Sequence, residues 1–204
     1  MLQASGRLNP YSTIIKHYTR NAIKQTLSLL PLSNVDIVIA DNPSAVMPEI
    51  GIGGYTPNAN LIFISLDPTF ANLKQSIQDN IFTVITHELH HAARWRSTGY
   101  GVTLFEAMIS EGLADHFATA LSNKRPVWIP NLKPKLLSLW QRKARRYFFR
   151  NDYNHHDWFF GSEQKQMPKW IGYGLGYAAV AQYLKKHTGT NTTKLYEENA
   201  EVFI

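Results

Sequence analysis

Apolar residues recur at the spacing of an α-helix in the first long segment of the chain. A helix is expected from Thr13 to about Leu30, because Ser12 can cap its start and Pro31 follows its end. One apolar stripe runs along this helix and consists of Ile14, Ile15, Tyr18, Ala22, Ile23, Leu27 and Leu30. A stripe of this kind packs against a hydrophobic core, so we interpret the helix as scaffold.

Two further helical patterns follow in the middle of the chain. The first lies between Ser76 and Ser97, without glycine or proline, and its apolar positions are Ile81, Val84, Ile85, Leu89 and Ala92. The second starts at Thr103, which fits a capping box together with Glu106. The apolar residues of this second helix predict that it is mostly buried, and they are Leu113, Ala114, Phe117, Ala118 and Leu121.

Two short strands are predicted, from Val35 to Ala40 and from Leu61 to Leu66. The segment 50–57 lies between them and contains three glycines and a proline. Such residues weaken a central strand, but they suit a strand at the edge of a sheet, a bulge or a glycine-rich loop. The pattern leaves the choice between an edge strand and a plain loop open.

The rest of the chain predicts a second part that is mainly helical. Prolines between Asn123 and Pro134 mark the connection into this part. A helix is expected at 178–187, a loop at 151–158, and a short acidic helix or tail at 192–204. The predicted class is α+β, with a small twisted N-terminal sheet packed on the helix at 76–97 and a mainly helical C-terminal lobe. Residues 1–204 are expected to form one domain, whose two parts meet near residue 122.

Composition narrows the class of protein. The chain has 204 residues, of which 44% are hydrophobic, so it is long enough to bury a core. No segment approaches the roughly 18 apolar residues of a membrane span, and the first thirty residues lack the apolar region of a signal peptide. We therefore expect no membrane partner and a cytoplasmic location. The absence of cysteine excludes disulfides and cysteine-type zinc sites.

The helical segment between Ser76 and Ser97 carries a candidate metal motif, in which His87, Glu88 and His91 fit the pattern His-Glu-x-x-His. Two imidazoles four residues apart lie on one face of a helix and can bind one Zn²⁺. Glu88 can then take a proton from a zinc-bound water, whose pKa the metal lowers to about 7. His90 shares this face of the helix, but only His91 completes the motif with Glu88. We interpret His90 as a packing residue or as a partner of a ligand.

A catalytic zinc site usually has a third protein ligand. The next helix offers two glutamates, and Glu106 already has a structural role in the capping box, which leaves Glu111. Asp115 lies one turn further on the same face, where it can accept the outward N–H of a zinc-bound histidine and fix its tautomer. A solvated helix face is the alternative for this pair, but the apolar neighbours disfavour it.

These motifs resemble those of known zinc enzymes. The similarity to the gluzincin arrangement of thermolysin-type metallopeptidases rests on His87, Glu88, His91, Glu111 and Asp115. With the Gly-Gly-Tyr-Thr-Pro segment at 53–57, the chain also resembles a bacterial family of unknown function described as predicted zinc-dependent proteases. The likeness runs from about residue 35 to about residue 121, with a weaker echo at 172–184. It implies Zn²⁺ as cofactor, Glu88 as base and hydrolysis of peptide bonds, and we expect a zincin-like fold.

A peptidase must also hold its substrate and stabilise the oxyanion of the tetrahedral intermediate. A sheet edge can hold an extended peptide through main-chain hydrogen bonds, and we place this role at Gly53, Gly54 and Tyr55. A tyrosine phenol can donate to the oxyanion, and the candidates are Tyr173 and Tyr177, which are otherwise core tyrosines. This C-terminal segment also resembles the tyrosine-bearing segment of oligopeptidase-type zinc enzymes.

His155 and His156 are further candidates for a hydrogen bond to a substrate oxygen. A surface loop without a role in the site is the favoured interpretation of these two residues.

The positive charge of the chain, +6 overall, is concentrated at residues 123–150, which contain nine lysines and arginines and no acid. Aromatic residues interleave with these charges, a composition typical of binding to nucleic acid or an anionic surface. The favoured interpretation is an amphipathic helix whose inward residues are Leu136, Leu137, Trp140, Ala144 and Tyr147. The basic face can also attract acidic substrates or partners to the cleft.

The sequence therefore predicts a zinc metallopeptidase that acts on peptides or proteins. The alternative is a basic nucleic-acid or protein interaction module, in which the zinc site is structural or catalytically silent.

Overall fold

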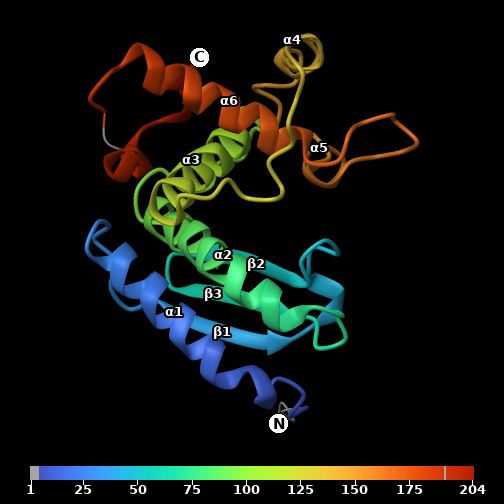
Figure 1. The fold of residues 1–204 in the computed structure, drawn as a ribbon. Coiled ribbons are helices and arrows are strands. Elements are labelled where there is room, and N and C mark those ends of the chain that lie inside the picture. Colours follow the sequence, from blue (N-terminus) through green and yellow to red (C-terminus); the bar gives the residue numbers. More distant parts are fainter. Residues whose placement is uncertain (1–4, 191) are drawn as a thin grey trace.

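The computed structural model describes residues 5–190 and 192–204 and shows a small sheet followed by a larger helical part (Figure 1). The strands are β1 (Asp36–Asp41), β2 (Ile52–Asn58) and β3 (Leu61–Leu66). The α-helices are α1 (Ser12–Leu27), α2 (Leu73–Trp95), α3 (Leu104–Ser122), α4 (Pro134–Arg145), α5 (His155–Phe160) and α6 (Ile171–Lys186). Short 3-10 helices lie at Asn9–Tyr11, Pro43–Ala45, Thr192–Glu197 and Ala200–Phe203. The predicted α+β class and the helical C-terminal part are confirmed.

The sheet has the strand order β1-β3-β2, in which β3 pairs in parallel with β1 and antiparallel with β2. Side chains alternate between the two faces of a strand. On β3, Ile62 and Ile64 are fully buried, whereas Phe63 between them is exposed. Helices α1 and α2 lie over the buried face (Figure 1). The segment 50–57, which the sequence left open, contributes the edge strand β2.

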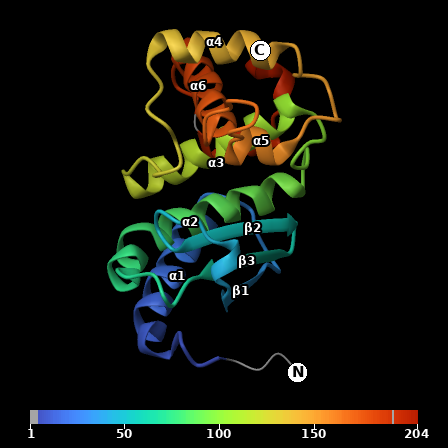
Figure 2. The ribbon, with the colours of Figure 1, turned by 90° about the vertical axis from the view of Figure 1, so that its right-hand side faces the viewer.

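Helix α3 connects the sheet part to the C-terminal helices, as Figure 2 shows, and it crosses α6 at very short range. A Cβ added to Gly112 would lie 2.4 Å from the backbone carbon of Gly176. A Cβ added to Gly176 would lie 1.9 Å from the carbonyl oxygen of Met108. Glycine is a poor helix former, but here it lets two helix backbones approach each other.

The prediction that the last long helix starts at Ala178 is wrong, because α6 begins at Ile171. The three glycines at 172, 174 and 176 weaken the local helical signal, yet all three are buried in helix packing. Tertiary contact thus overrides local propensity in this segment. The first helix also differs from its prediction, since Ser12 lies inside α1 and the helix ends at Leu27.

The predicted loop at 151–158 is also wrong in its second half, which forms the short helix α5. The Asn154 side chain caps this helix by accepting a hydrogen bond of 3.0 Å from the backbone N–H of Asp157. On α4, Trp140 and Ala144 are buried as predicted, but Leu136 is exposed, and so is Tyr147, which lies in the turn after the helix. Helix α4 lies at the periphery, so only a narrow strip of it contacts other elements (Figure 2).

The C-terminal segment packs against α3, α6 and the end of α2. Leu195, Ala200 and Phe203 are buried in one cluster with residues of α3 and α6. Arg94 of α2 is 2% exposed and donates to the carbonyl oxygens of Tyr196 and Glu198, at 3.2 and 2.9 Å. This tail is therefore part of the packed structure.

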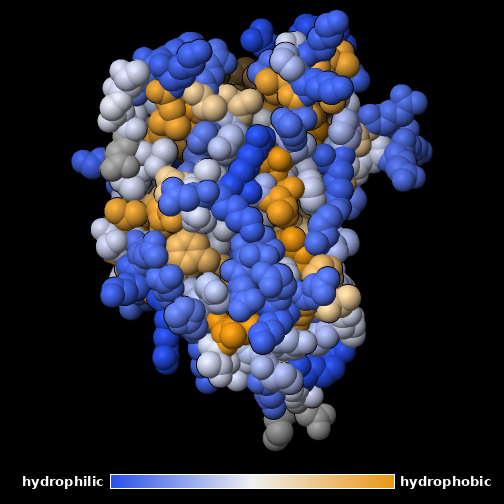
Figure 3. Space-filling model, viewed as in Figure 1, coloured by the Kyte–Doolittle hydropathy of each residue, from blue (hydrophilic) through white to orange (hydrophobic). Residues whose placement is uncertain are grey.

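Figure 3 shows that the face viewed in Figure 1 is mostly hydrophilic, with separate hydrophobic patches. The loop 161–169 between α5 and α6 projects at the right-hand edge of this view and is hydrophilic at its tip (Figures 1 and 3). Among residues 5–190 and 192–204, no helix has the length and apolarity that crossing a membrane requires. The predicted division near residue 122 coincides with the end of α3, and the single domain and zincin-like topology stay predictions.

Candidate metal centre

Helices α2 and α3 bring His87, His91 and Glu111 together. The Nε2 atoms of the two histidines are 2.9 Å apart, and Oε2 of Glu111 lies 3.0 Å from Nε2 of His87 and 3.4 Å from that of His91. Ligand atoms about 2.0 Å from a tetrahedral ion lie roughly 3.3 Å from one another. The spacing of these three atoms therefore fits a shared metal ion, and the group is a potential metal site.

The chemistry of the three donors also fits zinc. All three side chains are buried, and two imidazoles with one carboxylate form a ligand set typical of catalytic zinc sites. Burial disfavours the protonated ring of His87, but Asp115 and Glu111 outweigh it and raise the pKa of His87 well above its ordinary value. An environment that favours a proton on this ring also favours a bound cation in its place.

Asp115 lies behind His87, on the side away from Glu111. Its Oδ1 atom is 2.9 Å from Nδ1 of His87 and accepts a hydrogen bond of 2.8 Å from Nε1 of Trp128. Because Asp115 is fully buried, this contact holds the histidine ring in one orientation and leaves Nε2 facing the cluster. Asp115 thus lies against a candidate ligand histidine, as the sequence placed it, and its role toward a bound ion stays a prediction; the contribution of Trp128 was missed.

Glu88 points away from the three candidate ligands and toward β2. Its Oε2 atom accepts a hydrogen bond of 2.6 Å from the hydroxyl of Thr56, and burial raises its pKa. A Cβ added to Gly54 would lie 2.3 Å from Oε1 of Glu88. Glycine at this position therefore gives the carboxylate its place beside the edge strand.

Tyr100 is a site residue that sequence reasoning missed. Its hydroxyl donates a hydrogen bond of 2.8 Å to Oε1 of Glu111, the oxygen that faces away from the histidines. Burial and the neighbouring Glu111 raise the pKa of Tyr100 well above its usual range. The sequence signal that could have identified Tyr100 is its place between two glycines, Gly99 and Gly101, in the connection between α2 and α3. Both glycines have positive φ angles, 78° and 102°, which turn the chain back toward the cluster.

The protein family that the chain matches has a description that agrees with this geometry. A family model with the description "Predicted Zn-dependent protease (DUF2268)" matches residues 15–204. The chain belongs to this family. The match confirms the resemblance that the motifs predicted, and it extends that resemblance over the C-terminal lobe. No curated protein and no solved structure matches the chain.

Two cavities of this predicted zinc-dependent protease meet at the candidate metal centre. The first, about 470 Å³, is lined mainly by apolar side chains, among them Val46, Met47, Val84, Trp128, Trp170 and Tyr173. The second, about 390 Å³, is lined on its other walls by Thr56, Trp95, Tyr100 and His155. Both cavities share His87, Glu88 and the edge strand, so they form two arms of one cleft.

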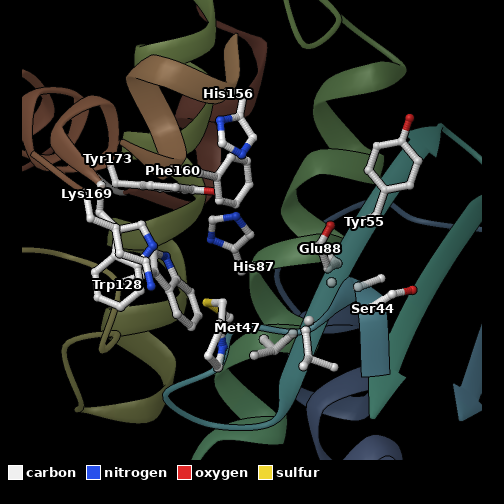
Figure 4. A pocket seen from close by; sticks show the side chains of 17 residues that line it. Ser44, Met47, Tyr55, His87, Glu88, Trp128, His156, Phe160, Lys169 and Tyr173 are labelled. Atoms are coloured by element: carbon white, nitrogen blue, oxygen red, sulfur yellow. The ribbon is translucent and has the colours of Figure 1, made fainter. Parts of the chain in front are cut away.

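The two candidate tyrosines lie in different environments. Tyr173 lines both arms, and Figure 4 shows its hydroxyl directed into the cavity that His87 and Glu88 also face. Tyr177 lines neither arm, because its ring stacks on His116 with centroids 3.9 Å apart. The structure thus brings Tyr173, and not Tyr177, to the candidate metal centre.

The other candidate residues differ in where they lie relative to the cleft. His155 lines the second arm and His156 the first. Gly53, Gly54 and Tyr55 of β2 line the cleft, and Tyr55 is 64% exposed, with its ring directed away from His87 (Figure 4). His90 is buried against Phe117, and burial lowers its pKa, so its packing interpretation fits its surroundings. The capping box of Thr103 and Glu106 is confirmed.

Proposed function

We propose that this protein is a zinc-dependent metallopeptidase that hydrolyses peptide bonds. The observation that carries the proposal is the convergence of His87, His91 and Glu111 within 3.4 Å, beside a buried glutamate that takes no part in the cluster. A structural zinc site is closed by four protein ligands, whereas a catalytic site keeps one position open. All three donors line the second arm of the cleft, and His87 also lines the first, which fits the catalytic type.

His87, His91 and Glu111 would hold the ion, and Asp115 would orient His87. Bound zinc would lower the pKa of a coordinated water to about 7 and polarise the substrate carbonyl. Glu88 serves as the general base that takes the proton of the attacking water and then delivers it to the leaving amine. The hydrogen bond from Thr56 holds this carboxylate in place, and its burial strengthens its basicity.

Tyr173 is our candidate for the oxyanion donor, because it lines both arms of the cleft whereas Tyr177 lines neither. Met47 bridges to Ile52 on the outer edge of β2, and beyond that bridge Gly54 lies beside Glu88, where an extended peptide can pair with the strand. The first arm is mainly apolar, so we expect a large apolar side chain next to the cleaved bond. The substrate would thus be held by hydrogen bonds of its main chain and by one apolar side chain, and a peptide supplies both.

The decisive experiment is the substitution Glu88→Gln. The amide cannot accept a proton, so turnover of a quenched fluorescent peptide should fall by a factor of about 10³ or more, since base catalysis contributes roughly 10²–10⁴. Zinc content, measured by mass spectrometry of the dialysed protein, should stay near one ion per chain. The matched control is Glu163→Gln in the exposed loop 161–169, which should leave both quantities unchanged. Full activity of Glu88→Gln, or no zinc-dependent cleavage by the wild type, contradicts the proposal.

A further inference from the structure

A third cavity, of about 460 Å³, lies between α4, the loop 146–154 and α5, away from the metal cluster. Its walls contain the aromatic residues Trp140, Tyr147, Tyr153 and Trp158. Trp140 and Trp158 meet edge to face with their ring centroids 6.0 Å apart, which gives the cavity a firm apolar wall. The proposed reaction makes no use of this cavity.

The rim of this cavity carries an excess of positive charge. Two of its cations are already paired, because Arg150 binds Asp152 at 2.7 and 2.5 Å and Lys165 binds Asp157 at 2.5 Å. The other two, Lys143 and Arg146, form no ion pair within 5–190 and 192–204. The ammonium of Lys143 lies 4.2 Å from the centre of the Trp140 ring, over the apolar wall. Two unpaired cations beside an aromatic wall fit an anionic ligand that also has apolar groups.

The cavity adjoins the catalytic cleft through one wall. Tyr153 lines the cavity, and its hydroxyl lies 3.3 Å from Nδ1 of His155, which lines the second arm of the cleft. Helix α5 separates the two spaces, and its six residues span roughly 9 Å. An extended chain covers about 3.3 Å per residue, so a peptide that leaves the second arm reaches the cavity within a few residues.

We propose that this cavity is an exosite for an acidic segment of the peptide substrate, in which Lys143 and Arg146 bind its carboxylates. The inference rests on the proposed peptidase function. A peptide is favoured over nucleic acid because the cavity and the cleft lie on either side of α5, within reach of one extended substrate chain.

Binding is tested without turnover on the Glu88→Gln protein. The probe is a fluorescein-labelled peptide with one central leucine and a run of four glutamates, compared with the same peptide in which glutamines replace the glutamates. We expect the acidic probe to bind about tenfold more tightly in anisotropy titrations at low salt, and the advantage to shrink as salt rises. Equal affinity for the two probes overturns the proposal.

The site is identified by two double variants with equal change of charge. Lys143→Gln with Arg146→Gln removes the cavity cations and should abolish the tenfold preference. Arg142→Gln with Arg145→Gln removes two exposed cations of the same helix that do not line the cavity, and it should retain the preference. Equal losses in both double variants indicate general attraction by the helix and overturn the exosite.

Two further arms separate this inference from its alternatives. In the enzyme that retains Glu88, Lys143→Gln with Arg146→Gln should lower kcat/KM for the acidic peptide about tenfold. The same double variant should leave kcat/KM for the glutamine peptide unchanged. If the wild type cleaves neither peptide while the binding preference persists, the proposed function fails and the anion-binding site remains. A labelled single-stranded RNA that binds more tightly than the acidic peptide, and loses affinity in the cavity variant, assigns the site to nucleic acid and overturns the peptide exosite.

Discussion

The junction of α2 and α3 differs from the junction of α4 and α5 in the burial and pairing of its charged side chains. At the first junction, five ionisable side chains are buried: His87, His91, Glu111 and Asp115 are linked by direct contacts, and Glu88 lies beside them, hydrogen-bonded to Thr56. At the second, the charges lie at the surface and each ion pair is local, such as Arg150 with Asp152. Buried ionisable groups are costly unless they are paired, whereas surface pairs contribute little to stability. The first junction is therefore organised for a bound ion, and the second for reversible electrostatic contact.

The largest expected effect comes from removing one donor of the buried cluster. Glu111→Gln replaces the only carboxylate among the three candidate ligands, so zinc affinity should fall by more than about 100-fold, beyond the loss typical of outer partners. Competition with a fluorescent zinc chelator measures the affinity. The contrast between the two junctions predicts that Asp152→Asn, at the exposed α4–α5 junction, leaves zinc affinity unchanged. A change of less than threefold in Glu111→Gln would show that this carboxylate is not a ligand.

A smaller effect is expected from Tyr100→Phe, which removes a hydrogen bond to Glu111 but keeps the aromatic ring. Tyr100 holds the oxygen of Glu111 that faces away from the histidines, so its loss frees the carboxylate to rotate. Zinc affinity should fall about tenfold, the lower end of the range for outer partners of metal ligands. The control is Tyr153→Phe, whose hydroxyl contacts His155 and not a candidate ligand. Equal affinity of Tyr100→Phe and wild type would show that the hydrogen bond has no positioning role.

The sequence predicted the first junction better than the second, and the reason is physical. His87 and His91 lie one turn apart on one helix, and Glu111 and Asp115 lie one turn apart on the next, so helical periodicity places each pair on one face. Short-range regularity therefore sufficed for the cluster. Asp115 was found in the same way, since its partner is a neighbour across a helix contact.

Residues outside these two helices were predicted less well, because their positions depend on long-range packing. Tyr100 reaches Glu111 from a glycine turn, and Trp128 reaches Asp115 from the proline-rich connection. Neither segment has a period that points toward the cluster. The choice between Tyr173 and Tyr177 depended on the rotation of α6, which is set where Gly176 crosses α3. Local sequence does not determine that rotation.

The smallest expected effect concerns His90, a buried histidine of α2 that belongs to neither the cluster nor the surface. Burial lowers its pKa well below the ordinary value, with a further contribution from the neighbouring His91. The unfolded chain has an unperturbed pKa of about 6.5, so below that pH it binds a proton that the folded protein does not bind. Folding stability must therefore decrease as the pH falls through about 6.5.

The substitution His90→Leu keeps an apolar contact with Phe117 and removes this titration. The free energy of unfolding, measured with urea in chelator-containing buffer, should fall with acidification less steeply in the variant than in the wild type. The expected difference is about 1 kcal/mol between about pH 6.5 and about pH 5.5, from one group that titrates only in the unfolded state. His17→Leu on the exposed face of α1 is the matched control and should reproduce the wild-type pH profile. Parallel profiles for His90→Leu and wild type would mean that His90 takes up its proton in the folded state as well, which requires a partner for its ring at the core of the α2–α3 junction.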